Sequence, residues 1–247
     1  MKGNSDKCHF LLSTNNDVNI KIGNSLVKRS NCEKLLGIQI DYKLSFDDHV
    51  KSICKKANNK LRALARVTPY MSFEKKKLVI NSFFKAQFNY CPLIWMLHSR
   101  QNNTIIKQLH EKCLRLIFND KLSSYEELLA KDGSVSIHHK NIQALAIEMF
   151  KIKKGLSPEI ISDIFTQQTE FCYNLRHQND FRVPFVRTVK HGSESISYLG
   201  PKIWNILPVD LEQLDSVGKF KNSIKTWVPE NCPCRLCKTY VNGVGFI

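Results

Sequence analysis

Apolar positions near the start of the chain follow the two-residue period of β-strands. Residues 19–22 alternate polar and apolar side chains, and a Gly-Asn pair separates them from a second short run at 25–27. This arrangement predicts a β-hairpin. The near-continuous apolar run at 35–40 predicts a strand that is buried on both faces or packed at a sheet edge. Gly37 inside this run predicts a bulge or a close backbone approach.

A helical period begins after this run. The sequence Ser-Phe-Asp-Asp at 45–48 predicts a capping box, with a serine hydroxyl and a carboxylate three residues later. Apolar residues then recur at helical spacing to about Val67, and Pro69 ends the helix. The opposite face is cationic and can contact phosphates, with an ordinary solvated helix face as the alternative. Three lysines at 75–77, in the first turn of the next helix, are expected to extend this surface because the two runs are close in sequence, with a solvated face as the alternative. The candidate nucleic-acid-binding residues are Lys51, Lys55, Lys56, Lys60, Arg62, Arg66, Lys75 and Lys76.

Further apolar stripes predict more helices along the rest of the chain. Gly133 and Gly155 are expected to end two of them. After residue 168 the pattern changes to polar turns and short β-like pieces, followed by a last helix. The expected caps are Ser72, Asn103, Ser123 or Ser124, and Ser216. The predicted fold is α+β and predominantly α-helical.

The charge of the chain narrows the classes of partner. Its 247 residues carry 37 basic and 22 acidic side chains, which gives a net charge of +15. An excess of this size favours a polyanionic partner, nucleic acid first and an acidic membrane surface second. No apolar run is long enough to span a membrane, and the N-terminus has no apolar signal-peptide core. The sequence therefore predicts a protein of the cytoplasm or nucleus that is not secreted.

The nine cysteines do not suggest a secreted disulfide framework, because their number is odd and six are scattered. The other three, Cys232, Cys234 and Cys237, have a spacing at which thiolates can share a zinc ion. Zinc usually takes four ligands, so a fourth must come from elsewhere, such as His191 or a partner chain. Free thiols, or the remnant of a site, are the alternative. The pair at 138–139 (His-His) is expected on the surface, and the pair at 110–111 (His-Glu) is expected in solvent.

Several segments, in their order along the chain, resemble the reverse transcriptases of non-LTR retrotransposons, in the jockey-like LINE group of animals. The resemblance covers essentially the whole chain. The matching pieces are 4–9 (Asn-Ser-Asp-Lys-Cys-His), 34–38 (Lys-Leu-Leu-Gly-Ile), 88–95 (Phe-Asn-Tyr-Cys-Pro-Leu-Ile-Trp), 109–115 (Leu-His-Glu-Lys-Cys-Leu-Arg), 193–204 (Ser-Glu-Ser-Ile-Ser-Tyr-Leu-Gly-Pro-Lys-Ile-Trp) and the cysteine cluster near the end.

The resemblance implies a division of the chain. Residues 1–44 resemble the end of the polymerase palm, with a primer-grip region near Leu36 and Gly37. Residues 45–120 resemble the helical thumb, which holds the template–primer duplex. Residues 121–168 then form a helical post-thumb region, and 169–247 a mixed C-terminal region. Many LINE proteins end in a cysteine-rich zinc knuckle, but this cluster lacks the usual histidine and final cysteine.

The resemblance also implies that this chain has no catalytic residues. RNA-directed DNA polymerases of the family hold two magnesium ions with palm carboxylates, and the aromatic-x-Asp-Asp hairpin that carries most of them would lie upstream of Met1. Met1 is therefore expected to be an internal methionine of a longer reading frame. The Asp47-Asp48 pair lies at a helix start and is expected to cap the helix and compensate its dipole. We predict that the chain binds no magnesium and cannot polymerise alone.

Three functions remain open from the sequence. The first is a non-catalytic fragment that binds RNA, DNA or a hybrid duplex without reading its sequence. The second is a zinc-stabilised or protein-interaction module, and the third is a decayed transposon copy with no host function. Strands in the first forty residues lack palm partners, which predicts local disorder or aggregation there. The tryptophans at 95, 204 and 227 are expected in the core, with base stacking as the alternative.

Overall fold

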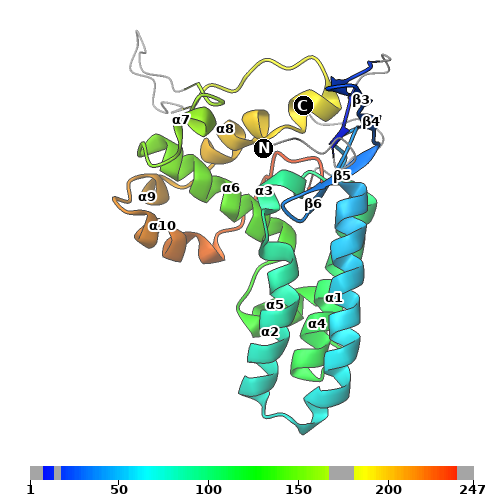
Figure 1. The fold of residues 1–247 in the computed structure, drawn as a ribbon. Helices are drawn as coiled ribbons and strands as arrows, with labels where there is room; N and C mark the ends of the chain where they lie inside the picture. The colour runs from blue at the N-terminus through cyan, green and yellow to red at the C-terminus, as the bar shows by residue number, and fades with distance from the viewer. Residues whose placement is uncertain (1–7, 14–17, 167–180, 238–247) are drawn as a thin grey trace, which may run out of the picture.

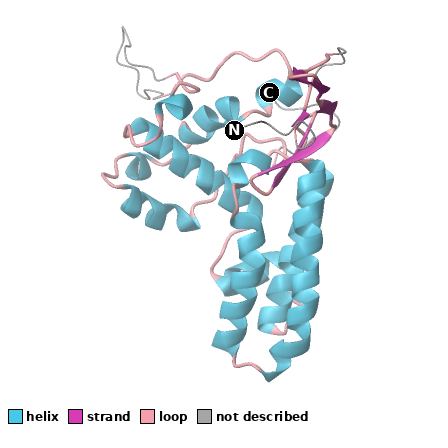
Figure 2. Cartoon of the chain, viewed as in Figure 1, coloured by secondary structure: helices cyan, strands magenta, loops and turns pink. Residues whose placement is uncertain are grey.

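The computed structural model describes residues 8–13, 18–166 and 181–237. The described chain is mainly helical, with a few short strands, as the sequence predicts (Figure 2). A long helical bundle extends from a broader part that holds the strands and the shorter helices (Figure 1). The first seven residues and the stretch 167–180 lie outside the described part, so the structure does not test the predictions made for them.

The bundle consists of α1 (Asp47–Val67), α2 (Phe73–Asn89), α4 (Arg100–Phe118) and α5 (Tyr125–Asp132). A short 3-10 turn, η2 (Thr68–Tyr70), joins α1 to α2 at the far end of the bundle (Figure 1). The bundle core contains the stripes that the sequence predicts, including Val50, Phe84 and Cys113, which are all fully buried. The predicted basic helix and its end before Pro69 are confirmed.

The second group of helices packs around α6 (Ile137–Lys153). Its core holds the rings of Phe150, Trp204 and Phe220, and the Phe150 and Phe220 rings stack with their centroids 4.3 Å apart. The elements around α6 are short: α3 (Pro92–Trp95), α7 (Glu159–Ser162), the π-helical turn η3 (Val189–Ser193), α8 (Ile196–Trp204), α9 (Val209–Glu212), α10 (Val217–Ser223) and η4 (Ile224–Thr226). Because α6 also sends Ile137 into the bundle core, it joins the two groups.

The strands form three two-stranded sheets. Strands β1 (His9–Phe10) and β4 (Lys28–Arg29) pair in parallel. Strands β2 (Lys21–Ile22) and β3 (Ser25–Leu26) form the antiparallel hairpin predicted around Gly23. Strands β5 (Cys32–Leu35) and β6 (Ile38–Asp41) form a second antiparallel hairpin next to the start of α1 (Figure 1).

The prediction of one buried strand at 35–40 is wrong, because the chain reverses in the middle of this run. Leu36 and Gly37 have φ values of 48° and 89°, and positive φ at both central residues suits a two-residue hairpin turn. Leu36 is 82% exposed, and its carbonyl oxygen accepts a hydrogen bond from Tyr90 Oη at 2.7 Å. The glycine therefore makes a turn and not a bulge.

The predicted capping box at 45–48 does not form, although the Ser45 hydroxyl accepts the N–H of Asp47 at 3.4 Å. Helix α1 begins at Asp47, and the residue before it, Phe46, has a left-handed backbone and no side-chain cap. The Asp41 carboxylate instead accepts the backbone N–H groups of Ser45 and Phe46, at 3.0 and 2.7 Å. Burial alone would raise the pKa of Asp41, but these hydrogen bonds outweigh burial and hold its pKa below the usual range.

For the N-terminal caps of two other helices, one prediction is wrong and the other is confirmed. Helix α4 begins before Asn103, because Ser99 is its cap and accepts the N–H of Asn102 at 3.3 Å. Helix α5 has the predicted capping box with Ser124 as the cap, and it ends at Gly133. The cap of α5 was predictable because all of its partners lie within a few residues of one another.

Candidate metal centre and cationic helix

Four side chains from two distant segments meet at the start of α6. His138, Cys232, Cys234 and Cys237 each offer one ligand atom, and these atoms all lie within 4.8 Å of one another. The Nε2 atom of His138 lies 3.2 Å from the Sγ atom of Cys234. His138, Cys232 and Cys234 are buried, and Cys237 is partly exposed. The arrangement is a His/Cys cluster of the size that one metal ion needs.

Helix α6 and the C-terminal loop hold the cluster from opposite sides. Ser136 caps α6 by accepting the N–H of His139 at 3.1 Å, which places His138 in the first turn. In the loop, the N–H of Cys237 donates to the carbonyl of Cys234 at 3.3 Å and closes a tight turn between the two thiols.

Neighbouring residues tie this loop to the rest of the molecule. The side chain of Arg100 donates to the carbonyl of Arg235 at 3.0 Å, and Arg235 forms an ion pair with Glu194 at 2.6 Å. On the upstream side, Gln143 Nε2 donates to the carbonyls of Lys225 and Trp227 at 3.1 and 2.8 Å. These contacts fix the path of the chain upstream of the cysteines and between Cys234 and Cys237.

The charges within the cluster are uneven. Burial lowers the pKa of His138, but the hydrogen bonds that its ring donates to the sulfurs of Cys234 and Cys237 outweigh burial and raise that pKa to about 9. The pKa of Cys234 is lowered because the side chains of Cys232 and Cys237, and then His138, hydrogen-bond to its thiolate. The pKa of Cys232 is raised by the same hydrogen bonds to the neighbouring sulfurs. A shared thiolate next to an imidazolium is a protonated form of a metal site, and a bound metal ion would displace these protons.

The donor set fits zinc. Three thiolates and one imidazole form a common ligand set of structural zinc sites, which are four-coordinate and leave no open position. Soft sulfur ligands also favour zinc over magnesium or calcium. The Nδ1 atom of His138 has no hydrogen-bond partner among the described residues, so Nε2 is the nitrogen that faces the sulfurs.

The sequence identified three of these four residues. The structure brings Cys232, Cys234 and Cys237 together, as their spacing predicts. The side chain of the suggested fourth ligand, His191, lies outside the described residues. His138 was expected on the surface, but it is only 8% exposed and occupies the fourth position. Its separation of 96 residues from Cys234 explains why local spacing did not reveal it.

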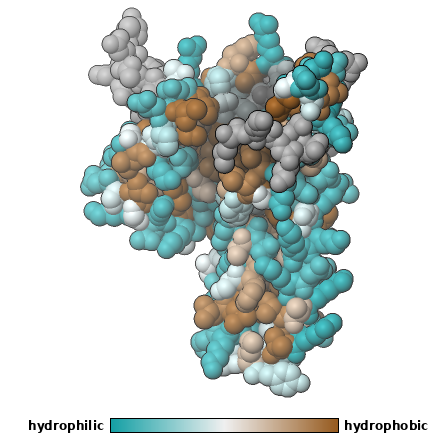
Figure 3. Space-filling model, viewed as in Figure 1, coloured by the Kyte–Doolittle hydropathy of each residue, from teal (hydrophilic) through white to brown (hydrophobic). Residues whose placement is uncertain are grey.

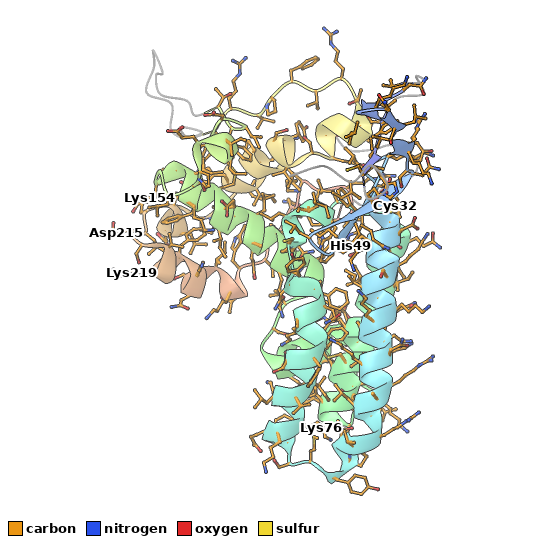
Figure 4. The ribbon with its side chains drawn as sticks, viewed as in Figure 1. Cys32, His49, Lys76, Lys154, Asp215 and Lys219 are labelled. Atoms are coloured by element: carbon orange, nitrogen blue, oxygen red, sulfur yellow. The ribbon has the colours of Figure 1, made fainter. Side chains whose placement is uncertain are left out.

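The cationic side chains of α1 line the outer side of the bundle. The arginines and lysines at 51, 55, 56, 62 and 66 are exposed, and Lys60 is half-buried with its Nζ atom 5.8 Å from the Phe83 ring centroid. Hydrophilic side chains cover this side of the bundle in Figure 3, and nitrogen-tipped side chains project from it in Figure 4. The helix buries its opposite face, so the sequence placed the cations correctly on the surface.

Four of these cations form a straight row. Lys51, Lys55, Arg62 and Arg66 are spaced at i, i+4, i+11 and i+15, which places them on one stripe about 22 Å long. The Nζ atom of Lys51 lies 3.5 Å from Oδ1 of Asp48, and an exposed ion pair of this kind contributes little to stability. Among the residues that the structure describes, no ion pair is recorded for the other three. The row therefore presents nearly uncompensated positive charge.

Lys75 and Lys76 lie in the first turn of α2, and Figure 4 shows Lys76 at the far end of the bundle. Lys75 is exposed and Lys76 is half-buried. The Nζ atom of the next residue, Lys77, lies 2.9 Å from the buried Asp132 carboxylate, so this lysine compensates a buried charge within the bundle. The two candidates thus lie at the same end as Arg66.

The other residues considered from the sequence, the Asp47-Asp48 pair, the tryptophans and His110, make contacts that stabilise the fold. The Asp47 carboxylate accepts a hydrogen bond from Asn102 at 2.6 Å and so links α1 to α4. Asp48 pairs with Lys51 within the first turn of α1. Trp95 and Trp204 are buried in the two cores, as expected. His110 was expected in solvent, but it is fully buried and its Nδ1 atom lies 2.8 Å from Tyr125 Oη.

In the described ranges, no helix combines the length and apolarity that crossing a membrane requires. Comparisons of the chain with protein-family models, with curated proteins and with solved structures find no match.

Proposed function

We propose that this chain is a non-catalytic module that binds nucleic acid through the phosphate backbone, as the thumb of a retroelement reverse transcriptase does. The observation that carries this proposal is the row of exposed cations along α1. Lysine and arginine neutralise phosphates without reading bases, so the module takes RNA, DNA or a hybrid duplex regardless of sequence.

The setting of the row supports this function. Val50 and Ala57 on the opposite face of α1 are fully buried, so the helix is held rigidly by the bundle. A rigid row keeps its charges at fixed spacing and loses little conformational freedom on binding. The net charge of +15 adds long-range attraction for a polyanion.

Fluorescence anisotropy with a labelled RNA–DNA hybrid at several salt concentrations tests the proposal. The test variant replaces Lys51, Lys55, Lys60, Arg62 and Arg66 with alanine. The wild type is expected to lose affinity steeply with salt, with a log–log slope of about −5 if about six phosphates are contacted. The test variant is expected to bind more weakly and with a shallower slope.

A matched variant controls for net charge. It removes five exposed lysines from other parts of the molecule: Lys112, Lys121, Lys219, Lys221 and Lys225. This variant has the same net charge as the test variant and is expected to keep most of the affinity. Equal weakening of both variants, or no binding by the wild type at low salt, would contradict a binding site on α1.

We also propose that the chain does not extend primers by itself. Asp47 and Asp48 form the only Asp-Asp pair of the sequence, and Asn102 and Lys51 engage their carboxylates. A primer-extension assay with magnesium measures this, and extension by purified protein that disappears in an Asp47→Asn variant would refute it.

A second proposal concerns the His/Cys cluster: His138, Cys232, Cys234 and Cys237 bind one structural Zn²⁺ ion. The observation that favours it is the convergence of four donor atoms within 4.8 Å. Zinc would link the C-terminal loop to α6 and so complete the second group of helices.

Elemental analysis of the purified chain, followed by cobalt substitution, tests zinc binding. The expected result is one metal per chain and the absorption of cobalt bound to thiolates. His138→Phe should abolish tight binding, whereas His139→Phe, which alters the neighbouring half-buried ring, should retain it. Equal metal content in both variants would exclude His138 as a ligand.

A further inference from the structure

The sulfurs of the proposed zinc site differ in their access to solvent. Cys232 and Cys234 are 9% and 3% exposed, whereas Cys237 is partly exposed. Cys237 also lines a cavity of about 270 Å³, between α4, α5 and the start of α6. The cavity next to Cys234 is only about 20 Å³, room for roughly one water molecule. A small solute therefore reaches the cluster at Cys237.

Cys234 and Cys237 are also placed to form a disulfide with each other. The N–H of Cys237 donates to the carbonyl of Cys234, so the two residues are the ends of a four-residue turn. The Cα atoms at the ends of such a turn lie within about 7 Å, close to the range that a disulfide needs. Their sulfur atoms already lie within 4.8 Å of each other.

We propose that Cys237 is a site of oxidation by hydrogen peroxide, and that Cys234 then resolves it to a disulfide with release of the metal. This inference rests on the proposed zinc site. It makes the link between the C-terminal loop and α6 reversible and sensitive to oxidants.

The chemistry proceeds in two displacements. The Cys237 thiolate attacks one peroxide oxygen; an S–O bond forms, the O–O bond breaks, and the leaving hydroxide takes a proton to become water. The Cys234 thiolate then attacks the sulfenic sulfur of Cys237; the S–S bond forms, the S–O bond breaks, and the leaving hydroxide takes a proton from solvent to become a second water. The two thiolates lose two electrons and the peroxide gains them.

Loss of two ligands would leave His138 and Cys232 as the only donors of the cluster, which is too few to hold zinc tightly. The contacts of Arg235 with Arg100 and Glu194 do not involve sulfur, so they would remain after oxidation. The loop is therefore expected to loosen from α6 without leaving the molecule, and a dithiol reductant with zinc should restore it.

The experiment uses the full chain loaded with zinc. Four cysteines that do not belong to the cluster, at positions 8, 32, 91 and 172, are replaced with serine. Hydrogen peroxide is added, zinc release is followed with a chromogenic chelator, and disulfides are mapped by mass spectrometry. The expected result is one zinc released for each Cys234–Cys237 disulfide, and recovery with dithiothreitol and zinc.

A Cys237→His variant keeps a four-donor set but removes the accessible thiolate. Zinc release from this variant is expected to be slower by about tenfold or more, because the remaining thiols are buried. Release at the wild-type rate, or a disulfide that maps elsewhere, would overturn the inference.

Two further outcomes are also decisive. If the Cys237→His variant does not hold zinc, dimedone labelling of the wild type during oxidation identifies the first sulfenic acid; labelling at Cys237 supports the inference and labelling first at Cys232 or Cys234 refutes it. If the untreated wild type binds neither zinc nor cobalt, the proposed zinc site fails, and the inference fails with it. Zinc binding with peroxide resistance refutes only the inference.

Discussion

The bundle and the group of helices around α6 are built in different ways. The three longest bundle helices, α1, α2 and α4, have 21, 17 and 19 residues and pack side by side over their length. Around α6, the helices α7 and α9 have four residues each and α10 has seven. Helices this short are not stable by themselves in water, so they depend on tertiary contacts.

The interiors of the two regions differ accordingly. Around α6, large rings converge from distant segments: the Phe181 ring packs edge-on against Trp204, and the Phe150 ring stacks on Phe220. The bundle interior also contains rings, such as Phe84 and Phe88 with their centroids 5.1 Å apart, and it adds buried polar groups such as His110 and Asp132. One region is held by the packing of long helices, and the other by contacts between short elements around α6 and by the His/Cys cluster. This difference predicts that metal matters to one region only.

Removing zinc should produce the largest effect, and it should be confined to the α6 group. Zinc in small structural sites contributes about 10–16 kcal/mol of apparent binding free energy, so chelation should release α10 and the loop at 232–237. Hydrogen exchange measured by mass spectrometry should show lost protection there and unchanged protection in α1 and α4. The control is His138→Phe, in which a chelator should change nothing. Uniform loss across both regions would show that they share one cooperative unit.

Core truncation should distinguish the regions by their coupling to zinc. Phe84→Ala in the bundle and Phe220→Ala next to α6 each remove a fully buried ring and should cost about 3–5 kcal/mol. Urea unfolding with and without zinc measures both costs. Only Phe220→Ala should also lower zinc affinity, because its ring supports the chain that leads to the cysteines. Equal zinc affinity in the two variants would contradict this coupling.

Acid should weaken the bundle through His110. Burial, and then the charges of Lys140 and Lys85, lower its pKa to about 3 from about 6.5 in the unfolded chain. The unfolded state therefore binds more protons than the folded state between these values, and stability falls as the pH falls from 6.5 towards 3. The slope is up to about 1.4 kcal/mol per pH unit. Urea unfolding of the wild type and of His110→Gln across this range measures it, and an unchanged slope in the variant would exclude His110 as the cause.

Loss of a single helix cap should have the smallest effect. Ser124→Ala removes the hydroxyl that accepts the N–H of Glu127 at 3.2 Å, and should cost about 1 kcal/mol. Thermal unfolding compares it with Ser82→Ala, an exposed serine within α2 that should stay within about 0.5 kcal/mol of the wild type. A larger effect at Ser82 than at Ser124 would show that α5 does not depend on its cap.

Much of the helical part of this fold was determined locally, and the sequence showed it. The stripe and the cationic face of α1 follow from a period of 3.6 residues, and its end follows from Pro69, which cannot continue a helix. The cap at Ser124 and the end at Gly133 depend on neighbours within a few residues. The trio Cys232, Cys234 and Cys237 was predictable for the same reason, because short spacing alone brings thiols together. The resemblance to reverse transcriptases stays a prediction, and so does the role of the α1 row.

Only the tertiary structure decided how these pieces meet. It placed the Asp41 carboxylate on the N–H groups of Ser45 and Phe46 just before α1, and it turned the apolar run at Leu36 into an exposed hairpin end. It buried His110 beside Tyr125, and it brought His138 to three cysteines that lie almost a hundred residues further along the chain. Periodicity and spacing report on neighbours along the chain. Long-range contacts depend on how separate helices pack, so the fourth donor of the metal centre became visible only once α6 and the C-terminal loop were in place.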